Sequence, residues 1–150
     1  MSSTDVAWVA IGSNLGRRGL ALARLREALT ADGVRIERVS SEILTRPFGV
    51  AAQPDFHNQL LVLRSPVPWT PQHWLDHAKG AEAAAGRRQT YHWGPRVADA
   101  DIILLGVHGE IRVDEPGLTV PHPGLHERPY LRRLLDELGA KEAEHPSQRR

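Results

Sequence analysis

The stretch TPQHWLDHAKGAEAAAG, residues 70–86, has the start and stop signals of one complete helix. Thr70 is a suitable N-cap, and Pro71 occupies the first helical position, where the missing N–H costs nothing. Trp74 begins an apolar stripe that continues through alanines at helical spacing, and Gly86 ends the pattern. The sequence therefore predicts a helix that packs one face against the rest of the domain.

Apolar runs on both sides of this helix predict strands. Residues 60–63 precede the helix and stop at Pro66 and Pro68, whereas residues 102–105 follow it. Further upstream, residues 34–44 alternate between polar and apolar side chains, which is typical of a long, half-buried strand. We expect these segments to lie side by side in one sheet.

The N-terminal part of the chain supplies one more strand and one more helix. Residues 6–11, VAWVAI, are apolar and rich in β-branched side chains, which predicts a buried strand before the turn GSNLG. Leucines at helical spacing follow, at positions 22, 25 and 29, and Gly33 lies where a helix terminator is expected. The predicted order of elements is thus β-α-β-β-α-β.

This order is the plan of ferredoxin-like α+β domains, in which helices pack on an antiparallel sheet. A short additional hairpin is predicted up to residues 118–120, and Pro129 opens a C-terminal helix with leucines on one face. We expect a single domain over residues 1–150 with its core at about 6–139. The charged residues 140–150 are expected to form a disordered tail.

Composition excludes several classes of function. The chain has 19 basic and 18 acidic side chains, a balance that argues against holding long nucleic acid by bulk electrostatics. It has no cysteine, which rules out thiol catalysis and cysteine-based zinc sites. No apolar run approaches the roughly 18–20 residues that span a bilayer, and a signal peptide is not evident. We expect a cytoplasmic monomer without nucleic-acid or membrane partners.

Two aspartates, Asp99 and Asp101, stand at the entrance of the predicted strand 102–105. Residues i and i+2 of a strand face the same side, about 6.5–7 Å apart, so the two carboxylates should project together. Mg²⁺ suits such a pair because it takes one or two carboxylates and leaves its other positions to water and phosphates. The alternative is a solvated strand end, or a pair of salt bridges to nearby arginines.

Cationic side chains surround the aspartate pair in the sequence. Arginine offers a fixed fork of donors that matches phosphate oxygens, so these residues fit a magnesium-bound polyphosphate. From the residues alone, the alternative that they only neutralise the aspartates stays equally open. The cations are Arg87, Arg88, His92 and Arg96 before the pair and His122 and Arg128 after it.

Four further residues are candidate ligand contacts. Asn58 can offer a donor and an acceptor to a planar heterocycle, although such an asparagine more often satisfies nearby backbone. Phe56 and Tyr130 could stack on a ring, but they fit a core equally well. Trp93 lies in a polar loop without an apolar stripe to join, which favours contact with a ligand or partner.

Taken together, these segments resemble one family, the 6-hydroxymethyl-7,8-dihydropterin pyrophosphokinases of folate biosynthesis. The resemblance extends over roughly residues 6–138, and the motif WGPR-x-x-D-x-D is its most specific part. It also rests on AIGSNLG, TRPFG, QPDFHN, E-x-x-x-G-R from Glu82 to Arg87, and LTVPHPGLHER.

The resemblance implies the transfer of a pyrophosphoryl group from ATP to the pterin hydroxymethyl oxygen, with release of AMP. ATP would be the co-substrate, and a pair of Mg²⁺ ions would be held by Asp99 and Asp101. A loop at residues 86–95 would close over both substrates and bring an arginine to the transferred group. The loop between Gly86 and Trp93 is shorter than the spacing that is commonest in the family. It therefore stays open whether Arg88 or Gln89 takes the place of the family's second loop arginine. The role of Lys79 is also open.

Site residues carried over by this resemblance fall into three groups. The catalytic group comprises Arg87, Arg96 and His122. The pterin group comprises Thr45, Phe48, Phe56, Asn58, Trp93 and Tyr130. The ATP group comprises Glu82, Arg88, Trp93, Arg96, Ile102, His122 and Arg128.

Two other functions compete with this hypothesis. A ferredoxin-like module that binds a nucleotide or RNA without catalysis would need exposed aromatics and a basic face. Aromatic residues make up only 5% of the chain, which counts against it. A degenerate family member that binds pterin without turnover is the other alternative, and the presence of both aspartates argues against it.

Overall fold

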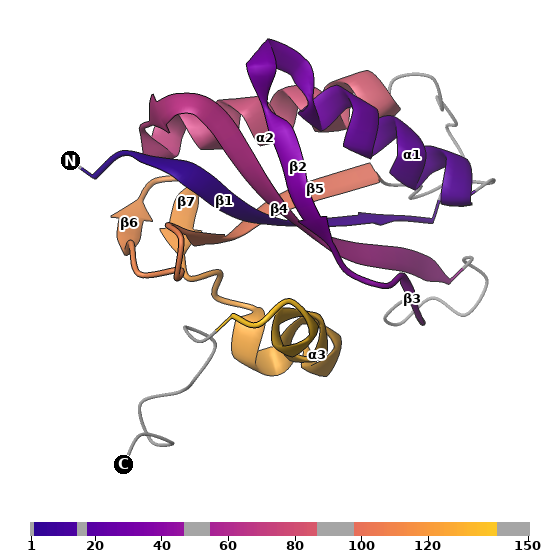
Figure 1. Ribbon diagram of the computed structural model, residues 1–150. Helices are drawn as coiled ribbons and strands as arrows, with labels where there is room; N and C mark the ends of the chain where they lie inside the picture. The colour runs from indigo at the N-terminus through magenta and orange to yellow at the C-terminus, as the bar shows by residue number, and fades with distance from the viewer. Residues whose placement is uncertain (1, 15–17, 47–54, 87–97, 141–150) are drawn as a thin grey trace.

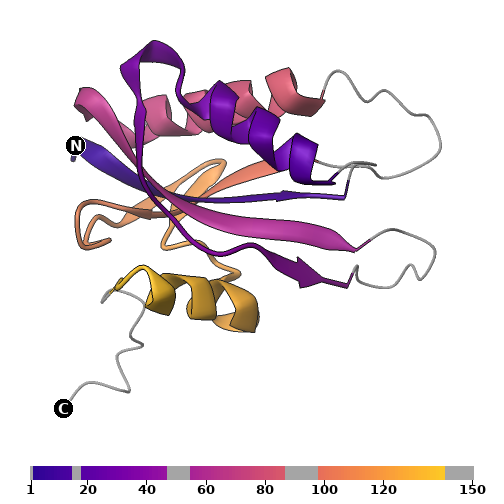
Figure 2. The same ribbon diagram turned by 45° about the vertical axis from the view of Figure 1, so that its right-hand side comes forward.

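The chain forms a three-layer arrangement with a sheet between helices. A computed structural model describes residues 2–14, 18–46, 55–86 and 98–140. Helices α1 (Arg18–Leu29) and α2 (Pro71–Gly86) cover one face of the sheet, and α3 (Pro129–Glu137) covers the opposite face (Figure 1). Figure 2 shows the same separation from a second angle.

The main sheet confirms the predicted ferredoxin-like order. Its strands are β1 (Thr4–Ser13), β2 (Arg35–Val39), β3 (Ile43–Thr45), β4 (Phe56–Trp69) and β5 (Ala98–Leu105). They run in the order β2-β4-β1-β5, with β3 beside β4, and all pairs are antiparallel.

The predicted C-terminal additions are also present. A hairpin of β6 (Val113–Glu115) and β7 (Leu118–Val120) precedes α3. Two short 3₁₀ turns, Ala31–Gly33 and Leu125–Glu127, complete the described elements.

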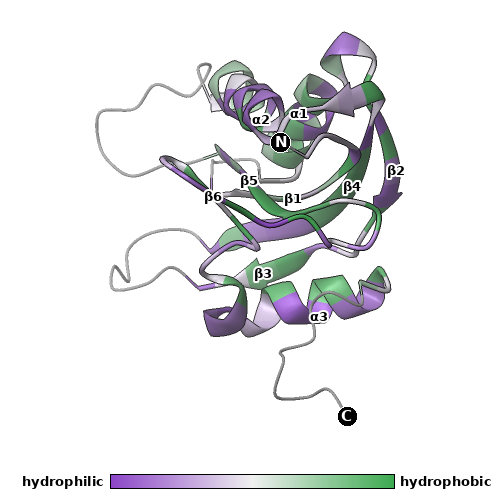
Figure 3. Ribbon diagram, turned by 90° about the vertical axis from the view of Figure 1, so that its left-hand side faces the viewer, coloured by the Kyte–Doolittle hydropathy of each residue, from purple (hydrophilic) through white to green (hydrophobic). Residues whose placement is uncertain are grey.

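Both faces of the sheet are buried, because the strands β1, β4 and β5 send apolar side chains in both directions. The core between this sheet and the helices α1 and α2 includes Val9, Ile11, Leu25, Leu61 and Trp74. The core between the sheet and α3 includes Val6, Trp8, Leu60, Ile103, Leu131, Leu134 and Leu135. The hydropathy colouring of Figure 3 shows the resulting apolar strands between polar outer helix surfaces.

The predicted ends of α2 and α3 are confirmed with small differences. The Thr70 hydroxyl accepts the N–H of His73 at 3.1 Å, which is an N-cap bond. Gly86 is the last residue of α2 rather than the residue after it. At the end of α3, the N–H of Gly139 donates to Asp136, and Ala140, assigned to the tail, is buried and donates to Leu135.

The strand predicted at residues 60–63 is part of a longer strand in the structure. This strand, β4, begins at Phe56 and continues through Pro66 and Pro68 to Trp69. The pairing of β4 with β1 is irregular here, since Arg64 pairs with Val6 and Trp69 with Thr4. The prolines therefore lie in a bulge, where a missing N–H breaks no ladder hydrogen bond.

The prediction of a single strand at residues 34–44 is wrong, because this segment is divided into the two strands β2 and β3. Ser40 interrupts the pattern: its hydroxyl oxygen accepts the N–H of Leu60 at 2.8 Å. Its carbonyl accepts the side-chain amide of Gln59 at 2.9 Å. The Ser40 N–H also donates to the carbonyl of Leu60 at 2.9 Å, so backbone and side-chain hydrogen bonds together hold this residue against β4 between the two strands.

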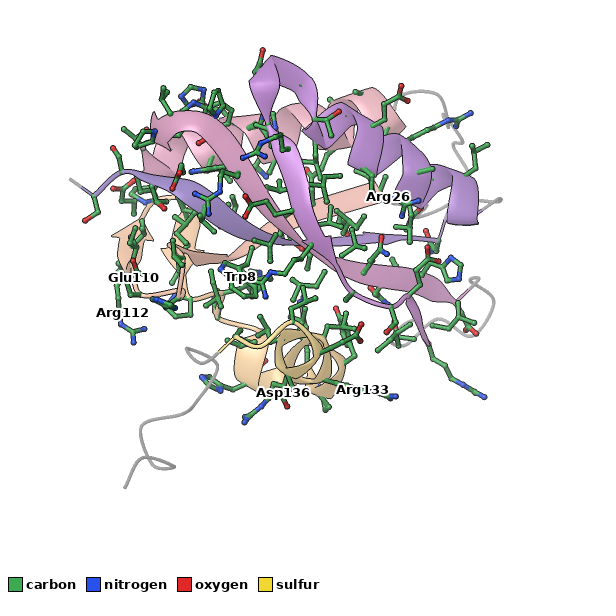
Figure 4. All side chains as sticks on the ribbon, viewed as in Figure 1. Trp8, Arg26, Glu110, Arg112, Arg133 and Asp136 are labelled. Atoms are coloured by element: carbon green, nitrogen blue, oxygen red, sulfur yellow. The ribbon has the colours of Figure 1, made fainter. Side chains whose placement is uncertain are left out.

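The C-terminal end of α3 is tied to the β2–β3 connection. Both carboxylate oxygens of Glu137 accept from Ser41, one from its N–H and one from its hydroxyl, each at 2.7 Å. Arg38 donates to the carbonyl of Leu138 and lies over the ring of Trp8. Trp8 projects from the sheet toward α3, whereas Arg133 and Asp136 lie on the outer side of that helix (Figure 4).

Candidate functional site

A cavity of about 270 Å³ opens between the sheet and the start of α3. Strands β1, β3, β4 and β5 supply its upper wall, and the chain entering α3 supplies its lower wall. This cavity, called cavity A, has a lining that is partly apolar and partly polar and includes carboxylates. Its residues are Ala10, Ile11, Gly12, Thr45, Arg46, Phe56, Asn58, Asp99, Asp101, Glu127, Arg128, Pro129 and Tyr130.

The side chain of Asn58 is oriented by hydrogen bonds in cavity A. Its side chain is 7% exposed, and its amide nitrogen donates to the hydroxyl of Thr45 at 2.8 Å. Gly12, on the neighbouring strand β1, makes room for it, since a Cβ built there would lie 2.9 Å from the Asn58 amide oxygen. The sequence predicts a turn at Gly12, but the residue lies inside β1, where it permits this close approach.

Asp99 and Asp101 lie within β5 and face cavity A together. Ala100, between them, points to the other face and joins the core under α1 and α2. Partial burial, together with the nearby carboxylates of Asp101 and Glu82, raises the pKa of Asp99 from 3.8 to about 6. The predicted same-face geometry is therefore present, and the two carboxylates repel each other.

A second cavity, cavity B, has a volume of about 290 Å³ and lies on the other side of β5. Apolar walls come from Leu75, Ile102 and Leu118, and Asp101 lines this cavity as well as cavity A. The remaining lining residues are Lys79, Ala100, Gly117, Thr119, His122 and Pro123.

His122 is held in one orientation beside cavity B. Its Nδ1 accepts the N–H of Gly124 at 2.9 Å, so in the neutral ring Nε2 carries the proton. Burial lowers the pKa of His122, and the nearby Arg128 lowers it further, while Asp101 opposes both. The ring is thus a neutral donor at Nε2, suited to an oxygen of a bound ligand.

Glu82 belongs to α2 and lines neither cavity, but it contacts the edge strand β5. Its carboxylate accepts the N–H of Ala100, a residue of the cavity wall, at 2.8 Å. Desolvation raises the pKa of Glu82, while the hydrogen bond from Ala100 and the charge of Lys79 act in the opposite direction. Glu82 therefore supports the strand that carries the aspartate pair.

The structure brings together most candidate residues that it describes. Thr45, Phe56, Asn58, Asp99, Asp101, Arg128 and Tyr130 line cavity A, and Ile102 and His122 line cavity B. Five candidates lie outside the described residues: Phe48, Arg87, Arg88, Trp93 and Arg96. His92 and most of the loop at residues 86–95, which is expected to close over the substrates, also lie outside them.

Sequence reasoning missed several wall residues. Leu75 belongs to no motif quoted above, and Leu118 and Thr119 open the motif LTVPHPGLHER but were not singled out as site residues; only the fold shows that all three surround an opening. Gly124 could have been found from its place in PHPG beside His122.

Neither a metal cluster nor a membrane span is found in the described part of the chain. No group of three or more histidine, cysteine, aspartate or glutamate side chains could hold a metal ion there. Among the described helices, none is long and apolar enough to cross a membrane. The expected monomeric state and cytoplasmic location stay predictions.

The fold and the site define an α+β domain with two cavities that share one carboxylate of an aspartate pair. Residues 8–140 match the family model of 7,8-dihydro-6-hydroxymethylpterin-pyrophosphokinase, and the chain belongs to this family.

Similar proteins come from several bacteria and from a plant. The chain is 35% identical over 129 residues to the 2-amino-4-hydroxy-6-hydroxymethyldihydropteridine pyrophosphokinase of Mycobacterium bovis, covering 82% of this chain and 66% of that protein. It is 31% identical over 140 residues to the Bacillus subtilis protein of the same name, covering 89% and 78%. A mitochondrial folate synthesis bifunctional protein of Pisum sativum is 36% identical over 135 residues, covering 87% of this chain and 25% of that protein.

Proposed function

We propose that the chain transfers the pyrophosphoryl group of ATP to the hydroxymethyl oxygen of 6-hydroxymethyl-7,8-dihydropterin and releases AMP. The observation that carries this proposal is the position of Asp101, which lines both cavities. Two substrates bound in cavities A and B meet at this carboxylate. Membership of the pyrophosphokinase family supports the same reaction.

Cavity A suits the pterin. The amide nitrogen of Asn58 donates to Thr45, so its carbonyl oxygen is the atom that accepts from an N–H on the edge of a ring. Phe56 and Tyr130 both line the cavity and can hold the ring between their faces. By family resemblance, Phe48 and Trp93 complete the pterin site.

Cavity B suits the nucleotide. Its apolar walls, Leu75, Ile102 and Leu118, match a purine, while His122 offers a donor to phosphate oxygens. Arg128 lies nearby and lowers the pKa of His122 by its charge. By family resemblance, Glu82, Arg88, Trp93 and Arg96 also belong to the nucleotide side.

Asp99 and Asp101 fit a pair of Mg²⁺ ions. Burial, and then the nearby carboxylates of Asp101 and Glu82, raise the pKa of Asp99, and a bound divalent cation would relieve this penalty on the charged form. Mg²⁺ is usually bound by one or two carboxylates, while phosphate oxygens and water supply its other ligands. When bound, the ions neutralise the negative charge that the triphosphate brings to the carboxylates.

Positioning and charge neutralisation account for the chemistry. The hydroxymethyl oxygen attacks the β-phosphorus of ATP in line, and the bond to the bridging oxygen between the α- and β-phosphorus atoms breaks. AMP departs with that oxygen, and the hydroxyl proton passes to solvent. Arg87 and Arg96 neutralise the transferred group, and closure of the loop at residues 86–95 excludes water.

The test is incubation of the protein with ATP, Mg²⁺ and 6-hydroxymethyl-7,8-dihydropterin, followed by nucleotide analysis. AMP is the expected product. ADP in place of AMP would refute pyrophosphoryl transfer, and pterin binding without turnover would identify a degenerate family member.

A further inference from the structure

The amide nitrogen of Asn58 is used for contacts inside the protein. It donates to the Thr45 hydroxyl at 2.8 Å and lies 3.4 Å from the carbonyl oxygens of Ile43 and Phe56. A carbonyl oxygen can only accept, so the atom that faces these two carbonyls is the amide nitrogen and not the amide oxygen. The bond to Thr45 is the shortest of the three and therefore contributes most to this orientation.

The amide oxygen of Asn58 is the atom that can serve a ligand. It lies next to Gly12 on β1, where a Cβ would come within 2.9 Å of it. Asn58 and Gly12 both line cavity A, so this oxygen lies at the cavity wall. The Asn58 side chain thus presents an acceptor to the cavity, and a ring that binds against it must supply an N–H.

The register of the sheet sets the distance between Asn58 and the aspartate pair. Gly12 pairs with Asn58 on β4 and with Asp99 on β5, so the three residues form one row across the sheet. Two strand spacings, about 10 Å, separate Asn58 from Asp99. A bicyclic ring with a one-carbon side chain is of similar length. A pterin whose pyrimidine edge meets Asn58 therefore directs its hydroxymethyl group toward the aspartates.

The pyrimidine edge of a pterin matches an acceptor. It carries the 2-amino group and the N3–H side by side, and a carbonyl oxygen with two lone pairs can accept from both. A 2,4-diamino ring has the same shape, but its N3 carries a lone pair in place of the hydrogen. Against the Asn58 oxygen this ring loses a hydrogen bond and sets two acceptors against each other. The orientation of one amide thus distinguishes the two kinds of ring.

We propose that the Thr45 hydroxyl is a specificity-determining group of cavity A, because it holds the Asn58 amide with its oxygen toward the ligand and so selects a 2-amino-4-oxo ring over a 2,4-diamino ring. This inference rests on the proposed function and deepens it, since it gives the Thr45 side chain a role in choosing the substrate. Thr45 acts through Asn58 and is therefore a positioning residue.

Thr45→Val tests this role, because it removes the hydroxyl and keeps the β-branched shape that suits a strand. Affinities for 6-hydroxymethylpterin and 2,4-diamino-6-hydroxymethylpteridine are measured by calorimetry at neutral pH, with Mg²⁺ and α,β-methylene-ATP present throughout. The unmodified protein should prefer the oxo ring by at least about tenfold. In Thr45→Val, affinity for the oxo ring should fall about three- to tenfold, and affinity for the diamino ring should stay or rise. The preference then falls by at least the same factor.

Thr45→Ser is the matched control, since it keeps the hydroxyl and should keep the preference. In an Asn58→Ala background, Thr45→Val should not change the preference further, because the amide through which it acts is absent. An equal loss of affinity for both rings in Thr45→Val overturns the proposal, and so does an unchanged preference. Melting temperatures and nucleotide affinity should be the same in Thr45→Val and Thr45→Ser, which excludes a general disturbance of the fold.

The two levels of inference fail in different ways. Absence of AMP formation by the unmodified protein counts against the proposed reaction. Equal affinity of the unmodified protein for the two rings, with AMP formation intact, overturns only the role of Thr45 in specificity. In turnover assays, the inference predicts that Thr45→Val raises the KM for the pterin and leaves the KM for ATP unchanged.

Discussion

Asp99 is held in β5 with its carboxyl group partly out of water and close to the carboxylates of Asp101 and Glu82. These surroundings penalise its charged form, which explains why its pKa rises to about 6. The folded chain therefore binds a proton more tightly than the unfolded chain between about pH 4 and pH 6. Stability falls as the pH rises through this window, and the full penalty is present at neutral pH.

Asp99→Asn should consequently stabilise the protein at pH 7.5 in the presence of a chelator. The expected gain in unfolding free energy is about 1–2 kcal/mol after allowance for solvent screening of a partly exposed group. Denaturant unfolding at pH 7.5 and pH 4 measures it, and the difference between variant and wild type should vanish at pH 4. AMP formation should be lost. A variant that is less stable than wild type at pH 7.5 would contradict the electrostatic explanation.

At the level of elements, the sequence predicted the order and type of the strands and helices, because these depend on local periodicity and caps. Interruptions that depend on partners were not predictable. Pro66 and Pro68 ended the predicted strand, yet β4 continues because its pairing with β1 is irregular there. Ser40 divided a predicted strand because its hydroxyl binds Leu60 across the sheet.

The same distinction applies to the candidate site. The i and i+2 spacing placed Asp99 and Asp101 on one face without knowledge of the fold, since strand geometry alone requires it. In contrast, the close approach of Gly12 to Asn58 joins two strands that are distant in the chain. Packing alone determines such contacts, so no sequence pattern announces them.

Helix α2 offers a direct test of a cap that was predicted from sequence. Thr70→Ala removes the acceptor of the His73 N–H and should lower the unfolding free energy by about 1 kcal/mol. This corresponds to a fall of roughly 2–4 °C in melting temperature for a chain of this size. Activity should be unchanged, because Thr70 lies at the end of α2 away from both cavities. Thr70→Ser, which keeps the hydroxyl, is the control, and equal losses in both variants would exclude capping as the cause.

At the level of the whole molecule, the two cores share the strands β1, β4 and β5. Each core contains a tryptophan whose indole N–H is hydrogen-bonded to backbone. Trp8, on the α3 side, donates to Gly106 at 3.0 Å, and Trp74, under the other helices, donates to Thr4 at 2.9 Å. Because the shared strands connect the cores, we expect both indole N–H groups to exchange with solvent only through global unfolding.

Leu134→Ala tests this coupling from the side of α3. Leu134 is fully buried, so its truncation should cost about 3 kcal/mol. Hydrogen exchange of the two indole N–H groups, followed by NMR, should report the same loss at Trp8 and Trp74. Leu25→Ala, a fully buried truncation under α1, is the matched control and should lower both values equally. Loss of protection at Trp8 alone would show that α3 opens independently, in which case the wall carrying Arg128 and Tyr130 could leave cavity A without unfolding the sheet.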